Sequence, residues 1–110
     1  MEIYTPDRGD LIWLEFDPSL GEEIQKRRPA LVLSPHIFNT STNFAMVVPV
    51  TSTVRNHGFE VALTGTKTKG VAVCQQVKCI AFRVRGSEFI EKAPCDIVKK
   101  ALTLVRAIVA

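Results

Sequence analysis

The sequence predicts a single domain of mainly antiparallel β-structure that ends in one α-helix. Three observations support this fold class. The length of 110 residues suits one domain. Short apolar runs alternate with turn-forming residues, as in a small barrel or sandwich, and the last segment instead repeats its apolar residues at helical spacing. No internal repeat, low-complexity tract or linker divides the chain, so we expect residues 1–110 to form one unit.

The expected strands are short apolar runs bounded by glycine, proline and other turn-forming residues. In chain order they cover residues 11–16, 30–34, 44–51 and 59–63, followed by a long or broken pair over 70–74 and 77–85. The polar run 39–43 is expected to be a turn before the third strand. The polar segment 17–28 is a long loop for so small a domain, and long loops often carry function.

The segment that begins at Pro94 has the pattern of an amphipathic helix. Its apolar residues are Ile97, Ala101, Leu104, Val105 and Ile108, and the opposite face holds Lys99, Lys100, Thr103 and Arg106. Pro94 suits the first helical turn, and Asp96 complements the positive end of the helix. We expect this helix to cover the sheet.

Composition and charge constrain the partners of the protein only weakly. A net charge of +3 and a pI of about 8.9 favour a polyanionic partner slightly, because many unrelated proteins are equally basic. The amino-terminal residues lack the apolar stretch of a signal peptide, and no run is long enough to span a membrane. An odd number of cysteines without an export signal suggests reduced thiols. We therefore expect a cytoplasmic protein that does not bind membranes, with Cys74 and Cys79 in its core.

The densest group of charges lies in residues 22–29, where two carboxylates and three cations precede a proline. Such runs usually form a solvated surface. The alternative is a phosphate-handling site, because Pro29 biases Arg28 towards an extended conformation and so fixes its direction where the strand begins. A guanidinium held there can bind two phosphate oxygens at once. The residues alone leave both interpretations open.

Two further polar groups interrupt or end apolar runs. Thr51 and Ser52 end the third expected strand, where hydroxyls either cap a turn or bind a phosphate oxygen. Gln75 and Gln76 lie within an apolar stretch, and neighbouring residues of a strand point to opposite faces. One of the two amides is therefore expected to face a groove, where an amide can recognise the edge of a base.

Familiar hydrolase motifs and metal-ligand clusters are absent from the sequence. His36 and His57 are the only histidines, and both lie in polar, turn-rich contexts. Surface positions are the commoner outcome for such residues, and an acid–base pair is the alternative. We expect no cofactor and no metal.

Four segments form a recognisable set, in order and at matching spacings. They are GDLIWLEFDP over 9–18, RPALVLSP over 28–35 with Phe38 and Asn39 after it, VPVTS over 48–52, and GVAVCQQV over 70–77. Together they resemble the MazF/PemK toxin family, and the resemblance extends from about Tyr4 to the last helix.

This resemblance implies an SH3-like antiparallel β-barrel with a carboxyl-terminal helix, working as a homodimer. It implies the toxin of a type II toxin–antitoxin system, a sequence-specific endoribonuclease that cleaves single-stranded RNA, chiefly mRNA, without a metal, and so inhibits translation and growth. The 2′-hydroxyl attacks the neighbouring phosphate and leaves 2′,3′-cyclic phosphate and 5′-hydroxyl ends. The family's catalytic arginine and threonine fall on Arg28 and Thr51, its loop glutamate on Glu23 and its strand glutamine on Gln76.

The expected site combines these residues with polar neighbours. Arg28, Thr51 and Glu23 are the expected catalytic residues, with Glu23 the candidate general base. RNA contacts are expected from Phe16, Lys26, Arg27, Asn39, Ser52, Arg55, Gln75, Gln76 and Lys78.

Three departures from the family pattern affect this expectation. The family loop commonly has the pattern Gly-x-Glu-Gln-x-Gly-x-Arg-Pro, whereas here Ile24 replaces the glutamine and Lys26 replaces the second glycine. We expect this loop to be stiffer or differently shaped. Some relatives use an arginine and an aspartate as acid and base at the positions of Val73 and Gln75. An amide cannot accept and pass on a proton as a carboxylate does, so that scheme is closed to this chain.

Partners and alternatives follow from the same resemblance. We expect a small acidic MazE-like antitoxin whose disordered tail occupies the basic groove as an RNA mimic, with promoter DNA bound through the antitoxin. One alternative function is a toxin of the same fold that binds and poisons DNA gyrase. The other is a non-catalytic nucleic-acid-binding module. Incubation with a defined single-stranded RNA distinguishes the three.

Overall fold

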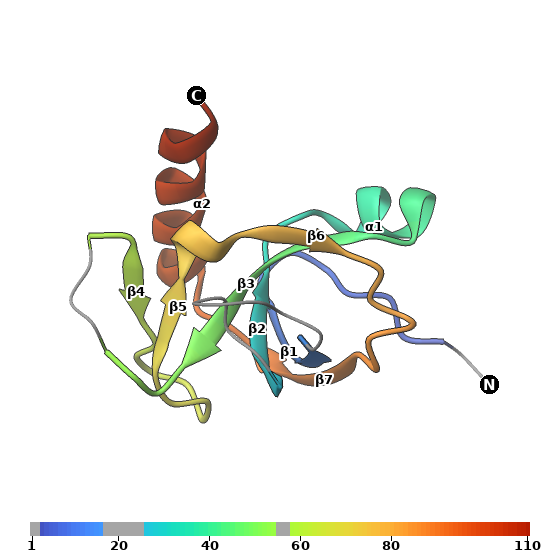
Figure 1. Cartoon of the computed structure of the whole chain (residues 1–110), viewed down its shortest axis with the longest axis horizontal. Coiled ribbons are helices and arrows are strands. Elements are labelled where there is room, and N and C mark those ends of the chain that lie inside the picture. The colour runs from blue at the N-terminus through green and yellow to red at the C-terminus, as the bar shows by residue number, and fades with distance from the viewer. Residues whose placement is uncertain (1–2, 17–25, 55–57) are drawn as a thin grey trace.

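The strands form one antiparallel sheet that carries two helices and a short 3₁₀ turn (Figure 1). The computed structural model describes residues 3–16, 26–54 and 58–110. The elements in chain order are β1 (Asp10–Glu15), β2 (Arg27–Val32), α1 (His36–Thr42), β3 (Ala45–Thr51), β4 (Glu60–Ala62), β5 (Val71–Val73), η1 (Cys74–Gln76), β6 (Lys78–Ile80), β7 (Glu88–Lys92) and α2 (Cys95–Val109).

The sheet is organised around β3, which pairs with three other strands. The order is β4-β5-β3-β2-β1-β7, and β6 pairs with the first half of β3 while β5 pairs with its last residues. The predicted fold class, mainly β with a carboxyl-terminal helix, is confirmed. In one detail the structure differs from the expected barrel, because hydrogen bonds between the described strands do not close the sheet.

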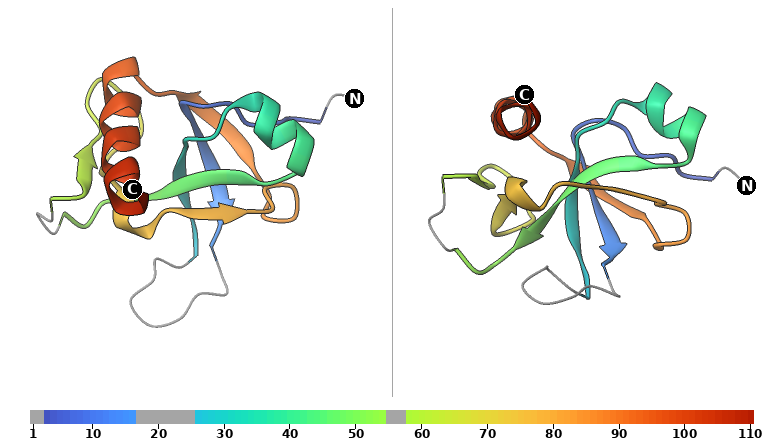
Figure 2. Two further views of the ribbon diagram at one scale, coloured as in Figure 1. Left: turned by 90° about the horizontal axis from the view of Figure 1, so that it is seen from above. Right: turned by 45° about the horizontal axis from the view of Figure 1, so that its top comes forward.

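Alternation along the strands divides the core between the two faces of the sheet. On one face, α2 packs on a cluster that includes Leu11, Leu31 and Val50. The other face has a second cluster that includes Ile12 and Phe16. Figure 2 shows α2 beside β4 and β5, with α1 at a separate part of the sheet near the amino terminus. The expectation that the last helix covers the sheet is confirmed.

Helix α1 was not expected, because its second half is the polar run interpreted above as a turn. Asn39 explains the difference, since its fully buried side chain donates to the carbonyl oxygens of Pro6 and Ser34 at 2.8 and 3.1 Å and accepts from the Ser34 hydroxyl. The Ser34 hydroxyl in turn accepts from the Met46 backbone N–H at 2.8 Å. These contacts fix the helix between β2 and β3, so tertiary hydrogen bonds override weak helix propensity here.

The segment after β4 also differs from the expected strand pair. Residues 71–73 and 78–80 form short strands that pair with β3 rather than with each other. Between them Gln75 and Gln76 lie in the 3₁₀ turn η1, so the argument from strand alternation does not apply to them. Strand β7, with the charged sequence EFIEK, was not expected at all.

The cysteines divide differently from the expectation. Cys74 is buried in the core, and this burial raises the pKa of its thiol to about 11. Cys79 is exposed rather than buried, because it lies on the outward side of β6 opposite Met46. Cys95 is also exposed, and all three are free thiols. Among the described residues, no helix combines the length and apolar character that a membrane crossing requires.

Candidate functional site

The register of the sheet brings Arg28 and Thr51 towards each other. Strands β2 and β3 pair with Ala30 opposite Pro49, and the same antiparallel register continued by two residues places Arg28 opposite Thr51. On its other side Arg28 lies opposite Leu14 of β1. Residues 23 apart in the sequence are thus placed towards the same end of the sheet, although the last residues of β3 turn from β2 towards β5 (Figure 1).

Both side chains belong to the same face of the sheet. In β2, Arg28 alternates with Arg27 and shares its face with Ala30, which lies in the core cluster that includes Phe16. Thr51 shares this face by the same alternation along β3. Arg28 is half-buried and Thr51 is only 9% exposed, so both groups are held by the sheet rather than by a free loop. We call this surface the Arg28 face.

One proline ends the ladder between β2 and β3 near the Arg28 face. The last pair of this ladder is Ala30–Pro49, and in the alternation set by the bond from the Leu33 N–H to the Met46 carbonyl, the N–H of residue 29 would point to β3, where proline has none. Thr51 pairs instead with Val71 of β5. Beyond Ala30 the ladder therefore no longer joins β2 to β3.

A close backbone approach holds Thr51 in place. A Cβ atom built on Gly70 would lie 2.3 Å from the Thr51 carbonyl oxygen, and Gly70 has a φ of +122°. Only glycine satisfies both conditions. The Thr51 hydroxyl accepts a hydrogen bond from the Thr53 N–H at 3.2 Å, which is the turn-capping interpretation of this residue. Gly70 is a positioning residue that sequence reasoning missed, although the Gly-Val pair after a turn was the available signal.

Lys78 adds a second cation near the Arg28 face. It lies opposite Val47 in the β3–β6 register, and its ammonium nitrogen is 5.7 Å from the centre of the Phe16 ring. Phe16 itself is 3% exposed within the core. An RNA base could therefore contact the Phe16 ring only if the residues that cover it moved. Lys78, in contrast, is half-buried and so partly accessible.

The remaining predicted RNA-binding residues are divided between several places. Arg27 projects from the opposite face of β2, where its Nη2 atom lies 2.8 Å from Glu88 Oε1. Gln75 and Ser52 are exposed, and Gln76 is half-buried. The expectation for Asn39 needs correction, because its buried amide is used fully in anchoring α1. Glu23 and Arg55 lie outside the described residues.

Lys26 has an unusual backbone conformation beside this face. Its φ is +71°, in the left-handed region that favours glycine, and its carbonyl accepts from the Phe16 N–H at 2.9 Å. The family pattern has glycine at this position. The departure noted in the sequence therefore puts a lysine into a conformation that strains any residue with a Cβ.

Other chemistry-bearing groups do not gather near the Arg28 face. His36 is exposed at the start of α1, with its Nδ1 atom 3.4 Å from the Thr40 hydroxyl, and His57 lies outside the described residues. Over the described ranges, no three histidine, cysteine or acidic side chains are placed to share a metal ion. The arrangement of Arg28, Thr51 and Lys78 can bind an anion and stabilise negative charge that develops on it.

Comparison with known proteins gives consistent results. Residues 7–109 match the family described as PemK-like, MazF-like toxin of type II toxin–antitoxin system. The chain is 49% identical over 84 residues to the endoribonuclease toxin MazF of Escherichia coli strain K12, covering 76% of each protein. It is 38% identical over 101 residues to the endoribonuclease PemK of Escherichia coli, covering 87% of this chain and 76% of PemK.

Solved structures agree with these relatives. The crystal structure of MazF (Form-I) from Deinococcus radiodurans superposes with a TM-score of 0.92 at 35% identity, covering 97% of this chain and 98% of that one. The MazE-MazF (Form-II) structure from the same organism gives a TM-score of 0.85 at 32% identity, covering 98% of both chains.

Proposed function

The chain belongs to the family of PemK-like, MazF-like toxins of type II toxin–antitoxin systems, and we propose from this premise how its endoribonuclease activity arises. The observation that carries the proposal is the β2–β3 register, which directs Arg28 and Thr51 to one face of the sheet. The substrate proposed is single-stranded RNA, chiefly mRNA, cleaved at a specific sequence. The consequence for the cell is inhibited translation and growth.

The proposed reaction is an internal transfer of the phosphate. The 2′-oxygen attacks the adjacent phosphorus, the bond from phosphorus to the 5′-oxygen breaks, and the products carry 2′,3′-cyclic phosphate and 5′-hydroxyl ends. The proton of the 2′-hydroxyl goes to a base, for which Glu23 is the candidate, and the departing 5′-oxygen gains a proton. No water is activated in this step, so the chemistry does not require a metal ion.

Arg28 is proposed to stabilise the phosphorane. Negative charge grows on the phosphate oxygens as the 2′-oxygen attacks, and a fixed guanidinium aimed at that charge acts mainly in the transition state. Thr51 contributes a neutral hydroxyl, which makes a weaker hydrogen bond than a charged donor. Lys78 in β6 and Lys26, which precedes β2, are proposed to hold the flanking phosphates. Gln76, in the turn η1 before β6, is proposed to contact a base.

The protein is proposed to act as a cytoplasmic homodimer. A groove of about 390 Å³ between α1, α2 and the end of β2 supports a surface for the second copy. Its apolar lining includes Phe38, Met46 and Val109, which are at least one-third exposed, together with Leu102 and Val105. A cluster of large exposed apolar side chains is typical of an interface.

An acidic antitoxin is the proposed regulatory partner. The related toxin from Deinococcus radiodurans forms MazE-MazF structures, which supports an antitoxin for this chain as well. The net charge of +3 is complementary to an acidic partner. We propose in addition that the complex binds promoter DNA through the antitoxin.

The test is cleavage of RNA with defined ends by the purified protein in the presence of EDTA. Mapping new 5′ ends after brief expression gives the cleavage sequence, and an oligonucleotide with that sequence is then cut in vitro. We expect 2′,3′-cyclic phosphate ends, and no cleavage when the nucleotide on the 5′ side of the scissile bond is 2′-deoxy. Cleavage of the deoxy substrate would contradict the mechanism. Activity that EDTA abolishes and Mg²⁺ restores would contradict metal independence.

A further inference from the structure

Strand β4 is the edge of the sheet farthest from β7. It is the first strand in the order β4-β5-β3-β2-β1-β7, and no described strand pairs with its outer side. The Leu63 N–H donates to the Gly70 carbonyl and the Cys74 N–H to the Phe59 carbonyl, so odd-numbered residues here bond to β5. Alternation then directs the N–H and C=O of Ala62 away from β5. An edge of this kind is a template for another extended chain.

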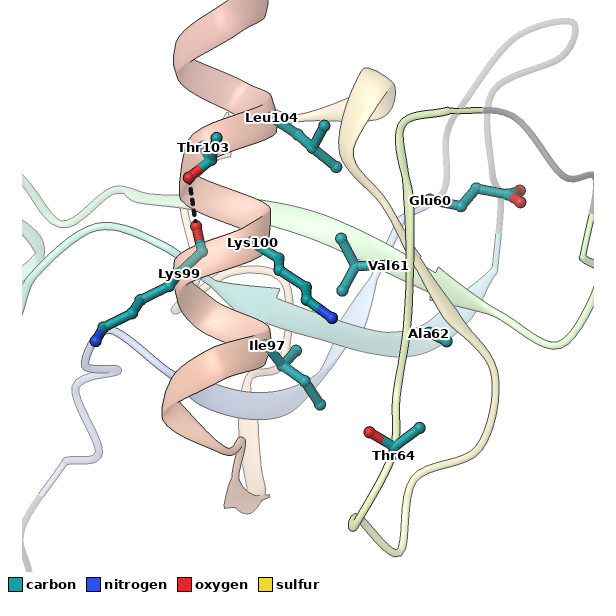
Figure 3. Close-up of a pocket in the computed structure, with 9 residues that line it drawn as sticks. All are labelled: Glu60, Val61, Ala62, Thr64, Ile97, Lys99, Lys100, Thr103 and Leu104. Atoms are coloured by element: carbon teal, nitrogen blue, oxygen red, sulfur yellow. Dashed lines mark hydrogen bonds between the residues drawn. The ribbon is translucent and has the colours of Figure 1, made fainter.

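A groove lies between this edge and α2. Its volume is about 510 Å³, and it is lined on one side by β4 and Thr64 and on the other by one flank of α2 (Figure 3). Val61, Ile97 and Leu104 provide apolar side chains at its floor. The groove can therefore accept alternate apolar side chains of a strand while β4 supplies the backbone hydrogen bonds.

The charged side chains beside the groove favour a ligand of a particular charge. Figure 3 shows Lys100 extending from α2 into the space in front of Val61 and Ala62, whereas Lys99 extends from the other side of the helix. Both lysines are exposed. The charged residues that line the groove are Lys99, Lys100 and Glu60, so cations outnumber carboxylates. A strand that enters here would thus meet apolar surface and a net positive charge, which suits alternating apolar and acidic side chains.

We propose that this groove binds an extended, acidic segment of the antitoxin, which adds to β4 as a further strand. The proposal rests on the antitoxin partner proposed above and assigns it a second contact. The outward N–H and C=O groups of β4 complement the backbone of a peptide. RNA offers phosphates and bases instead, and no aromatic side chain lines the groove on which a base could stack. A second copy of this basic chain lacks the charge complementarity.

The groove is separate from the Arg28 face. In the strand order, β5 and β3 lie between β4 and β2, which corresponds to roughly 14 Å at the usual spacing between strands. The antitoxin bound here would be anchored to the toxin without touching Arg28 or Thr51. Variants of the groove should therefore lose affinity for the antitoxin while the free toxin still cleaves RNA.

Ala62→Pro and Lys100→Glu test the proposal, with Lys99→Glu as the matched comparison, since Lys99 also lines the groove but its side chain extends away from β4 (Figure 3). Proline is tolerated in an edge strand where the N–H points outward, but it removes the donor that an added strand needs. Lys100→Glu reverses the charge that reaches the groove, and Lys99→Glu makes the same change on the neighbouring residue. The probe is the antitoxin encoded beside the toxin gene, with affinity measured by calorimetry and RNA cleavage measured on each free variant.

We expect Ala62→Pro and Lys100→Glu each to weaken antitoxin binding by about tenfold, and Lys99→Glu to have a clearly smaller effect. RNA cleavage by the free variants should equal that of the wild type. Equal antitoxin affinity for wild type and both groove variants would overturn the proposal, as would a loss of RNA affinity or of dimerisation without a loss of antitoxin binding. If the antitoxin does not bind the wild-type toxin at all, the proposal of an antitoxin partner is contradicted. This outcome differs from a loss of binding that is confined to the groove variants.

Discussion

Two polar clusters of this small sheet contrast in how their polar groups are used. In the anchor cluster, Ser34 and Asn39 bond to each other and to the backbone, and they join α1 to β2, β3 and the amino-terminal segment. On the Arg28 face, Arg28 and Thr51 lie beyond the Ala30–Pro49 pair, where Pro29 ends the β2–β3 ladder, and Lys78 lies opposite Val47 with its ammonium near the Phe16 ring. The first arrangement is closed by the protein's own hydrogen bonds, whereas the second gathers polar side chains on one face of the sheet.

Structural and functional polar residues differ here in their position in the sheet and not in whether they have hydrogen-bond partners. No buried side-chain nitrogen or oxygen in the described part of the chain is left without a hydrogen-bond partner, so burial of a polar residue alone says little. The two clusters differ in the burial of their polar groups and in their position along the strands. Asn39 is fully buried with its amide used on both sides, and Arg28 is half-buried at the end of a strand. Substitutions in the two clusters should therefore affect different measurements.

Arg28→Ala should give the largest effect on activity. Loss of one charged donor to a developing oxyanion typically lowers the rate by about 10²–10³-fold, so the variant should be non-toxic. Arg28→Lys should rescue poorly, because an ammonium cannot bridge two phosphate oxygens. Single-turnover cleavage of a defined RNA measures the rate, and urea denaturation should show unchanged stability. If Arg28→Ala were largely unfolded under the assay conditions, its loss of activity would indicate a structural role for Arg28.

Asn39→Ala should give the opposite result. The change removes hydrogen bonds to Pro6, to the Ser34 carbonyl and to the Ser34 hydroxyl in the interior, at about 1 kcal/mol each. The free energy of unfolding should fall by about 3 kcal/mol in urea denaturation. Below the unfolding transition, the cleavage rate per folded molecule should stay within about twofold of the wild type. A hundredfold lower rate in a fully folded variant would restore Asn39 to the RNA-binding set.

Thr51 lies between these two extremes, because its hydroxyl caps a turn and the residue belongs to the Arg28 face of β3. Thr51→Val keeps the shape and removes the hydroxyl, and Thr51→Ser keeps the hydroxyl. We expect Thr51→Val to lower the cleavage rate by about fivefold, since a neutral hydrogen bond contributes about 1 kcal/mol. Thr51→Ser should stay close to the wild type in the same assay. Equal losses in both variants would favour a packing role for the threonine methyl group.

The sequence predicted the parts of the fold that depend on local pattern. Apolar runs bounded by turn-forming residues identified the central strands, and helical spacing identified α2. It missed α1 because the polar residues of that segment form a helix only through the contacts of Asn39 with distant backbone. It missed β7 because a charged edge sequence resembles a loop until its pairing with β1 is known.

The site was predictable to a similar degree. Pro29 indicated that Arg28 has a fixed direction, and the family resemblance pointed to Thr51. The sequence could not reveal that the β2–β3 register aligns them, because strand register depends on contacts between segments far apart. Nor could it show that Gly70 must approach Thr51 without a Cβ. Both facts are tertiary, and the Gly-Val pair after the turn indicated only that a glycine was present, not which backbone it approaches.

Lys26→Gly should relieve backbone strain beside the Arg28 face. Lys26 has a φ of +71°, which glycine adopts freely. We expect the free energy of unfolding to rise by about 1 kcal/mol, the usual cost of a left-handed conformation for a residue with a side chain. Urea denaturation measures this change. Lys26→Asn is the control, since asparagine tolerates this conformation better than lysine, and it should give a smaller gain. A destabilised Lys26→Gly variant would show that the lysine side chain has a stabilising contact that outweighs the strain.

Arg27→Ala should have the smallest effect, and it tests the assignment of the two faces directly. Arg27 and Arg28 are adjacent, equally charged and in the same strand, but alternation points them to opposite faces. The ion pair of Arg27 with Glu88 is exposed, with side-chain accessibilities of 37% and 72%, so its loss should change stability by roughly 0–1 kcal/mol. RNA affinity should fall slightly through the lost charge, and the single-turnover rate at saturating RNA should be unchanged. If Arg27→Ala abolishes cleavage while Arg28→Ala does not, the catalytic surface lies on the Glu88 side of the sheet and the assignment of the Arg28 face is wrong.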